Sequence, residues 1–214
     1  MNKIKLKGDL TMLRQDIKQK LQNENYFLQD EDISSQDLEG IVETLGDKEV
    51  PSIDLASNYI GDVAALTLMQ LSTRNLGLAK TNLTDETVHQ LLACNKYSSL
   101  NLRGNKITDS AFSELDVESL TSITQLDLSY TYISDATLNF LVKFPNLKIV
   151  LLNFNQSLSS NAVIKLAGKL SLCYIESFGC QLNDKTREIM GRFNVSNKDR
   201  TTKFLKKKSI SCLY

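Results

Sequence analysis

The sequence contains no tryptophan, one histidine and two prolines in 214 residues, and its 25 basic residues balance 25 acidic ones. Balanced charge gives the chain as a whole no attraction to nucleic acid or to a membrane surface, so we expect no nucleic-acid partner. The four cysteines form no CxxC pair, which argues against a zinc site or a disulfide framework. Their number and spacing indicate a reducing compartment.

Long apolar stretches are also missing. No run approaches the ~18 residues that a membrane-spanning helix needs. The N-terminal stretch "MNKIKLKGDLTML" is basic but lacks the apolar centre of a conventional signal peptide. We therefore expect a protein of cytoplasmic type.

Catalytic motifs are absent as well. The sequence has no Gly-rich phosphate loop ending in Lys-Ser or Lys-Thr, no HExxH and no GxSxG. His89 and Cys94 lie five residues apart, a separation at which helical side chains do not face each other. We expect no enzyme activity, no cofactor and no metal site.

The sequence does contain a repeat. "LNLRGNKITD" (Leu100 to Asp109) has apolar residues two apart, then a polar residue, an Ile and an Asp. The same order recurs in "SIDLASNYIGD", "NLGLAKTNLTD" and "QLDLSYTYISD", and more weakly in "NYFLQDEDISS", "IVLLNFNQSLSS" and "YIESFGCQLND". The first apolar positions are 26, 53, 76, 100, 126, 150 and 175, which are 23 to 27 residues apart. A fixed period of this length is typical of a stacked repeat protein.

Each copy predicts a strand, a turn and a helix. Apolar residues at i and i+2 lie on one face of a strand. The polar residue at the turn, such as Asn105, can satisfy backbone groups that no neighbouring strand reaches. Apolar residues at helical spacing follow in "DLEGIVETL", "ETVHQLLA", "ATLNFLVKF" and "NAVIKLAGKL". The residue before each helical segment is predicted to be its N-cap, and these residues are Ser35, Asp62, Asp85, Asp109, Asp135, Ser160 and Asp184. A metal site along the Asp column is the alternative interpretation.

The pattern LxxLxLxx(N/T/C)x(I/L)xDxxxxxL resembles the leucine-rich repeat in its α-helical forms, the ribonuclease-inhibitor-like and cysteine-containing subclasses. The resemblance covers roughly residues 25–194, with departures at Glu31, Ser177 and Cys180 and an insertion near Gln156. It implies an α/β fold, a horseshoe-shaped solenoid of about seven repeats with parallel strands on the concave face and helices on the convex face. It also implies a protein-binding function.

The expected domain organisation has three parts. Residues 1–24 form an N-terminal helical cap, residues 25–194 the solenoid, and residues 195–214 a basic C-terminal tail. Within that tail, residues 196–214 hold six basic residues and one acidic residue. "KFLKKK" could contact anionic lipid or nucleic acid or serve as a nuclear-import signal, and a solvated run is the alternative.

The candidate partner site lies on the concave face of the last three repeats, where aromatic residues accumulate, and it is bordered by a few charges, one of them from the repeat before. Such a composition is typical of a binding hot spot. The proposed site residues are Arg103, Asp127, Tyr130, Phe154, Tyr174, Glu176 and Phe178. The alternative is that the tail covers this patch with its own apolar residues, which are Phe204, Leu205, Ile210, Leu213 and Tyr214.

The function predicted from the sequence is non-catalytic binding of a protein partner by a monomer. The chain resembles leucine-rich repeat effectors that intracellular bacteria deliver into host cells by a non-classical system, which implies a host protein as partner. One alternative is a substrate-recognition subunit resembling the F-box type of ubiquitin-ligase adaptor. Another is a membrane-surface protein that uses the basic tail.

Overall fold

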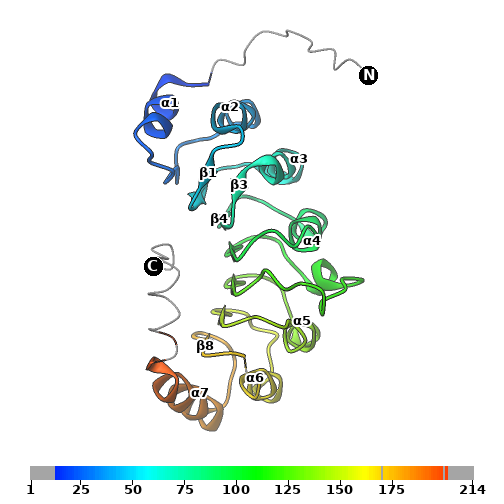
Figure 1. Cartoon of the computed structure of the whole chain (residues 1–214). Coiled ribbons are helices and arrows are strands. Elements are labelled where there is room, and N and C mark those ends of the chain that lie inside the picture. The colour runs from blue at the N-terminus through cyan, green and yellow to red at the C-terminus, as the bar shows by residue number, and fades with distance from the viewer. Residues whose placement is uncertain (1–12, 170, 200, 202–214) are drawn as a thin grey trace.

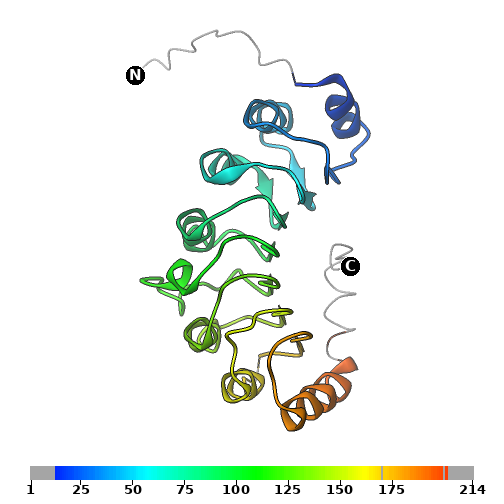
Figure 2. The same ribbon diagram turned by 180° about the vertical axis from the view of Figure 1, so that it is seen from behind.

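The computed structural model describes residues 13–169, 171–199 and 201. It is an α/β stack in which strands and helices alternate along the chain. Figure 1 shows the strands following one another along one side of a curved stack and helices α2 to α6 along the other, and Figure 2 shows the same division from behind. Helices α1 and α7 lie at its two ends.

Six of the described strands form one parallel sheet, in the order β2-β4-β5-β6-β7-β8. Their bounds are β2 Ile53–Asp54, β4 Asn75–Gly77, β5 Ser99–Asn101, β6 Gln125–Asp127, β7 Ile149–Leu151 and β8 Tyr174–Glu176. Phe27 adds an isolated parallel bridge to Asp54, and β1 (Glu49–Val50) pairs with β3 (Ser72–Thr73) in a separate two-stranded sheet.

The register of the sheet matches the repeat that the sequence predicts. The residues paired in line across the sheet are Ile53, Leu76, Leu100, Leu126, Val150 and Ile175, the first apolar residues of successive copies. Each has its side chain buried in one continuous core that runs from Ile17 to Met190. Stacking is what buries these faces, because a single strand and helix cannot enclose its own apolar side.

The helices occupy the segments between strands. Their bounds are α1 Gln15–Gln22, α2 Ser35–Leu45, α3 Gly61–Ala65, α4 Asp85–Ala93, α5 Asp135–Leu141, α6 Ser160–Ala167 and α7 Asp184–Ser196, with short 3-10 helices η1 Leu66–Gln70 and η2 Asp109–Phe112. The four segments predicted from apolar spacing are α2, α4, α5 and α6. In the described part of the chain, none of the helices is long and apolar enough to span a bilayer.

Buried polar residues connect the turns. The amide nitrogen of Asn105 donates to the carbonyl oxygens of Leu78 and Leu102, at 2.7 and 2.9 Å, and its amide oxygen accepts from the backbone N–H groups of Thr81 and Leu83. Asn58 and Asn155 likewise donate to carbonyls of two successive repeats. One side chain therefore satisfies backbone groups of two repeats, as a buried turn requires.

The Asp residues play a different part from the one predicted. The N-caps are the residues one earlier, such as Thr84, Thr108 and Ser134, or two earlier at Ile60, so the prediction that the Asp residues are N-caps is wrong. Instead, the Asp109 carboxylate accepts hydrogen bonds from the backbone N–H and hydroxyl of Ser134, at 2.9 and 2.6 Å. Asp62 and Asp85 bond in the same way to the cap residue of the next repeat. The Asp column links neighbouring repeats.

The last strand is closed by α7. The Asn194 amide oxygen accepts from the Ile175 N–H, and its nitrogen donates to the Ile175 carbonyl oxygen at 2.7 Å. The side chain thus imitates a neighbouring strand at the edge of the sheet, an edge that would otherwise be open to pairing with another chain.

Candidate functional site

Four of the predicted site residues form a continuous row across four repeats. The rings of Tyr130 and Phe154 are stacked, with centroids 4.3 Å apart and planes 22° apart. Phe154 meets Phe178 edge to face at 5.4 Å, and the Arg103 guanidinium carbon lies 4.4 Å from the centre of the Tyr130 ring. We call these four residues the aromatic row. Stacked and cation–π pairs at these distances are favourable arrangements.

The row is built on a turn that recurs along the stack. Tyr130 and Phe154 have φ of +56° and +59°, in the left-handed region, and occupy the turn position at which other repeats place Ser57, Lys80 and Gly104, which also have positive φ. A non-glycine residue in this region costs about 1 kcal/mol or more. The left-handed turn is therefore common to the repeats, and what distinguishes this part of the stack is the aromatic side chain that two repeats place there.

Space for the rings comes from a neighbouring glycine. A Cβ on Gly179 would lie 2.6 Å from two atoms of the Phe154 ring, and Gly179 itself has φ of +71°. The Phe154 ring therefore lies directly over the backbone of the next repeat. Its neighbour Phe178 keeps 71% of its surface exposed, and Tyr130 keeps 42%. The row presents aromatic surface to solvent instead of filling the core.

Polar groups border the row on its strand side. The buried Asp127 accepts a hydrogen bond from the Ser129 N–H at 2.8 Å. Asn153 donates to a Glu176 carboxylate oxygen at 3.0 Å and accepts from the Phe178 N–H at 2.7 Å. This network holds the backbone that carries Phe178. Burial raises the pKa of Asp127 above its ordinary value, although hydrogen bonds from Ser129 and the charge of Arg103 oppose the rise.

Tyr174 lies apart from the row. It is the first residue of β8, whereas Phe178 follows the last one, so the two are at opposite ends of the strand. Tyr174 packs instead against a buried cluster of Ile149, Leu151 and Cys173. We call these four residues the apolar floor. The single aromatic patch predicted on this face is thus two clusters, a row at the turns and a floor on the strands.

Two of the larger open cavities lined by described residues adjoin the repeats, and the sequence predicted neither. One, of about 460 Å³, lies beside the aromatic row and is lined by Phe178, Cys180, Arg187 and Met190, with Ser177 and Gly179. Its walls come from the last turn and from α7, so it depends on how that helix packs against the last repeat. No sequence pattern indicates that packing.

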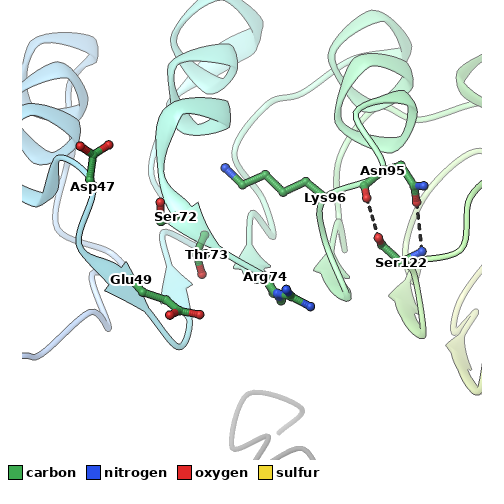
Figure 3. A pocket seen from close by; sticks show the side chains of 8 residues that line it. All are labelled: Asp47, Glu49, Ser72, Thr73, Arg74, Asn95, Lys96 and Ser122. Atoms are coloured by element: carbon green, nitrogen blue, oxygen red, sulfur yellow. Dashed lines mark hydrogen bonds between the residues drawn. The ribbon is translucent and has the colours of Figure 1, made fainter.

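The other cavity, of about 520 Å³, lies near the opposite end of the strands (Figure 3). Its lining mixes charges of both signs: Asp47, Glu49, Ser72, Thr73, Arg74, Asn95, Lys96 and Ser122. Several polar groups are already engaged, because Lys96 donates to the Met69 carbonyl oxygen and the Ser122 N–H donates to the Asn95 amide oxygen. Because its lining carries both positive and negative charges, the cavity does not favour a ligand of either sign.

The groups that the sequence raised as candidate catalysts are dispersed. His89 is half-buried on α4, and the Cys94 thiol donates to the Leu91 carbonyl oxygen. Within residues 13–169, 171–199 and 201, no group of three or more His, Cys, Asp or Glu side chains is placed to hold a metal ion. What the described surface offers is aromatic and cationic contact area, which suits binding.

Comparison with known proteins identifies the repeat. The leucine-rich repeat family model matches residues 98–115, the central copy, and the other copies pair with it in register through the sheet. The chain therefore contains a leucine-rich repeat in its central copy, within an α/β repeat fold. The comparison indicates no catalytic family, and a comparison with curated protein sequences finds no match.

Two solved structures are similar to the chain. An internalin of Listeria monocytogenes has 18% identity and a TM-score of 0.46, over 70% of this chain and 46% of that one. The leiomodin-1 actin-binding site 2 has 14% identity and a TM-score of 0.37, over 89% of this chain and 92% of that one. The chain thus spans about half the length of the internalin.

Proposed function

We propose that this chain is a non-catalytic protein-interaction module that engages its partner through the aromatic row and the neighbouring strand face. The single observation that carries this proposal is the row of Arg103, Tyr130, Phe154 and Phe178, whose stacked and cation–π contacts leave the Tyr130 and Phe178 rings exposed. Aromatic residues and arginine dominate the energetics of protein interfaces.

The partner chemistry follows from the row and its border. Exposed ring faces and edges bury apolar surface of a partner, and Arg103 adds one cation that already rests on a ring. Asp127 and Glu176 beside the row carry carboxylates. A mixed border of this kind sets orientation more than affinity, which suits a folded protein with both charges on its surface.

The proposal extends to the setting and the architecture. We infer a bacterial effector that acts as a monomer on a host protein, with residues 25–194 forming a horseshoe arc of seven repeats of the ribonuclease-inhibitor-like kind. The composition supports this setting, since 19 lysines against 6 arginines suit an AT-rich genome. A translocation assay in infected cells, with a reporter fused to the chain, tests it.

Site-specific photo-crosslinking tests the binding surface. A photoreactive phenylalanine analogue replaces Phe178 in one protein and Tyr132 in another, and each is irradiated in host-cell lysate. Tyr132 is the matched control because it is an aromatic residue on the turn that carries Tyr130, 70% exposed, and outside the row. We expect a discrete crosslinked partner from position 178 and not from position 132.

Adding Tyr130→Ala to the position-178 protein removes the ring that stacks on Phe154 and bears Arg103. Loss of such an anchor commonly costs about 2 kcal/mol, which is roughly a thirtyfold loss of affinity, so the crosslinked product should decline strongly. Equal labelling from positions 132 and 178, or a product that Tyr130→Ala leaves unchanged, would refute the proposed surface.

A further inference from the structure

The strand face of the last repeats carries apolar side chains that do not belong to the core. Successive residues of a strand point to opposite faces. Val150 of β7 lies in the continuous core, so its neighbours Ile149 and Leu151 point to the other side of the sheet. They are nevertheless buried, at 1% and 9% exposed, with Cys173 and Tyr174 as the rest of the apolar floor.

A buried amide next to the floor has no partner of its own. Gln125, on β6, pairs with Ile149 in the register of the sheet. It is 1% exposed, and neither atom of its side-chain amide has a hydrogen-bond partner among the described residues. A buried amide normally finds one. One donor and one acceptor side by side suit the backbone of a peptide segment lying over the floor.

Carboxylates stand at the edge of the same surface. Asp127 and Glu176 are at the ends of β6 and β8, on the same side of the sheet as Leu151. Burial of Asp127 and the nearby Glu176 charge both disfavour ionisation of that carboxyl group. The positive charges of a cationic segment over the floor would offset both effects by stabilising the ionised carboxylate.

The chain itself leads to this surface. After α7, the Thr201 N–H donates to the Asn197 carbonyl oxygen, and the Thr201 hydroxyl donates to the Cys173 carbonyl oxygen at 2.8 Å. Cys173 is part of the floor. The last described residue is therefore bonded to the edge of the floor, and residues 202–214 lie outside the described residues.

We propose that residues 202–214 dock on the apolar floor of their own chain. This segment has four lysines and no acidic residue, together with Phe204, Leu205, Ile210, Leu213 and Tyr214. The apolar residues match the floor, and the lysines match Asp127 and Glu176. The reach is sufficient, because thirteen residues span about 20 Å even as a helix, and β8 lies two strand spacings, about 10 Å, from β6.

Docking of this segment places it on part of the strand face, beside Asp127 and Glu176, so a partner that uses this part of the face has to displace the segment. The aromatic row, at the turns, stays outside that contact. The proposal concerns an internal contact and does not require that the partner-binding function be correct.

Limited proteolysis of the full chain tests the docking. Trypsin cleaves after the exposed lysines of an undocked segment, and the rate of cleavage reports the fraction of open molecules. We expect Leu151→Ser, which places a polar group in the floor, to speed cleavage at Lys206–Lys208 by about tenfold or more. Asn101→Ser, at the equivalent position of β5, should leave the rate unchanged.

A second variant distinguishes release of the segment from unfolding of the repeats. Phe204→Ser with Leu205→Ser alters only the segment, and its cleavage rate is normalised to a synthetic peptide of residues 199–214 with the same changes. We expect it to speed cleavage like Leu151→Ser, while cleavage at Lys106 within the repeats stays at the wild-type rate in all variants.

Two results would overturn the proposal. One is rapid cleavage at Lys206–Lys208 in the wild-type chain, at the rate of the free peptide. The other is protection that increases with protein concentration, which would assign the docked segment to a second copy of the chain.

Discussion

At the scale of single residues, the buried asparagines connect one repeat to the next. Asn105 satisfies two carbonyl oxygens and two N–H groups, drawn from its own repeat and the preceding one. The residue is 2% exposed, so solvent does not reach these backbone groups while the Asn105 side chain is in place. The stability of the turn region therefore depends on a side chain that is neither apolar nor exposed.

We expect Asn105→Ala to lower the free energy of unfolding by about 2–4 kcal/mol, because it leaves buried backbone groups without partners. Chemical denaturation measures the change. Asn139→Ala is the control, since Asn139 is exposed on α5 and its amide oxygen accepts from Lys165, and it should stay within about 0.5 kcal/mol of wild type. Similar stabilities for the two variants would contradict the role assigned to Asn105.

At the scale of elements, the Asp column joins each helix to the next. Asp109, at the start of η2, accepts four hydrogen bonds, two from Ser134 and two from Thr137 of the following helix. Burial acts to raise its pKa, but the bonds from Ser134 and Thr137 outweigh burial, so the pKa lies below its ordinary value of 3.8. The charged form is the one that the folded state stabilises.

The pH dependence has a definite sign. A carboxyl group with a lower pKa in the folded state stabilises the fold above its unfolded pKa, and this contribution disappears as the pH falls through the folded value. We expect Asp109→Asn to cost about 1–2 kcal/mol at pH 7, since hydrogen bonds to a charged acceptor are lost. The difference from wild type should shrink as the pH is lowered from 5 to 3.

Denaturation at a series of pH values measures this difference, with Asp116→Asn as the control. Asp116 is exposed in the loop after η2, so its substitution should have little effect at any pH. A cost of Asp109→Asn that stays constant down to pH 3 would exclude the charged carboxylate as its origin.

The aromatic row makes a second prediction at this scale. Gly179→Ala should cost more than Gly61→Ala, although both residues have φ near +70°. A Cβ at Gly61 meets no atom within 4 Å, so that variant incurs only the backbone cost, about 1 kcal/mol. A Cβ at Gly179 also collides with the Phe154 ring. Thermal denaturation of both variants, at matched concentration, gives the comparison, and equal costs would show that the ring moves away freely.

At the scale of the whole molecule, the repeats share one core, so a destabilising substitution in the central repeat should also destabilise its neighbours. Leu102 is fully buried at the centre of the array. We expect Leu102→Ala to cost about 2–5 kcal/mol. Because each repeat is stabilised by its neighbours, hydrogen exchange should accelerate in β5 and also in the flanking β4 and β6. Faster exchange confined to β5 would argue against coupled repeats.

The sequence by itself determined the repeat, the register of the sheet and four of the helices. These features depend on the spacing of apolar residues within each copy, such as the two-residue spacing of Leu100 and Leu102. A local pattern of this kind can be recognised in the sequence alone. The polar residue of each turn was also predictable, because a buried turn needs a side chain such as that of Asn105.

Only the tertiary structure decided how neighbouring copies touch. In the folded chain, the Asp109 carboxylate accepts a hydrogen bond from Ser134 of the next repeat. The Phe154 ring lies over Gly179, and Tyr174 lies in a different cluster from Phe178. These contacts join residues about one repeat apart, and their geometry depends on the offset between stacked repeats and on the packing of α7. The spacing of residues along one copy contains no information about either, so the row, the floor and the cavity beside Phe178 appear only when the copies are stacked.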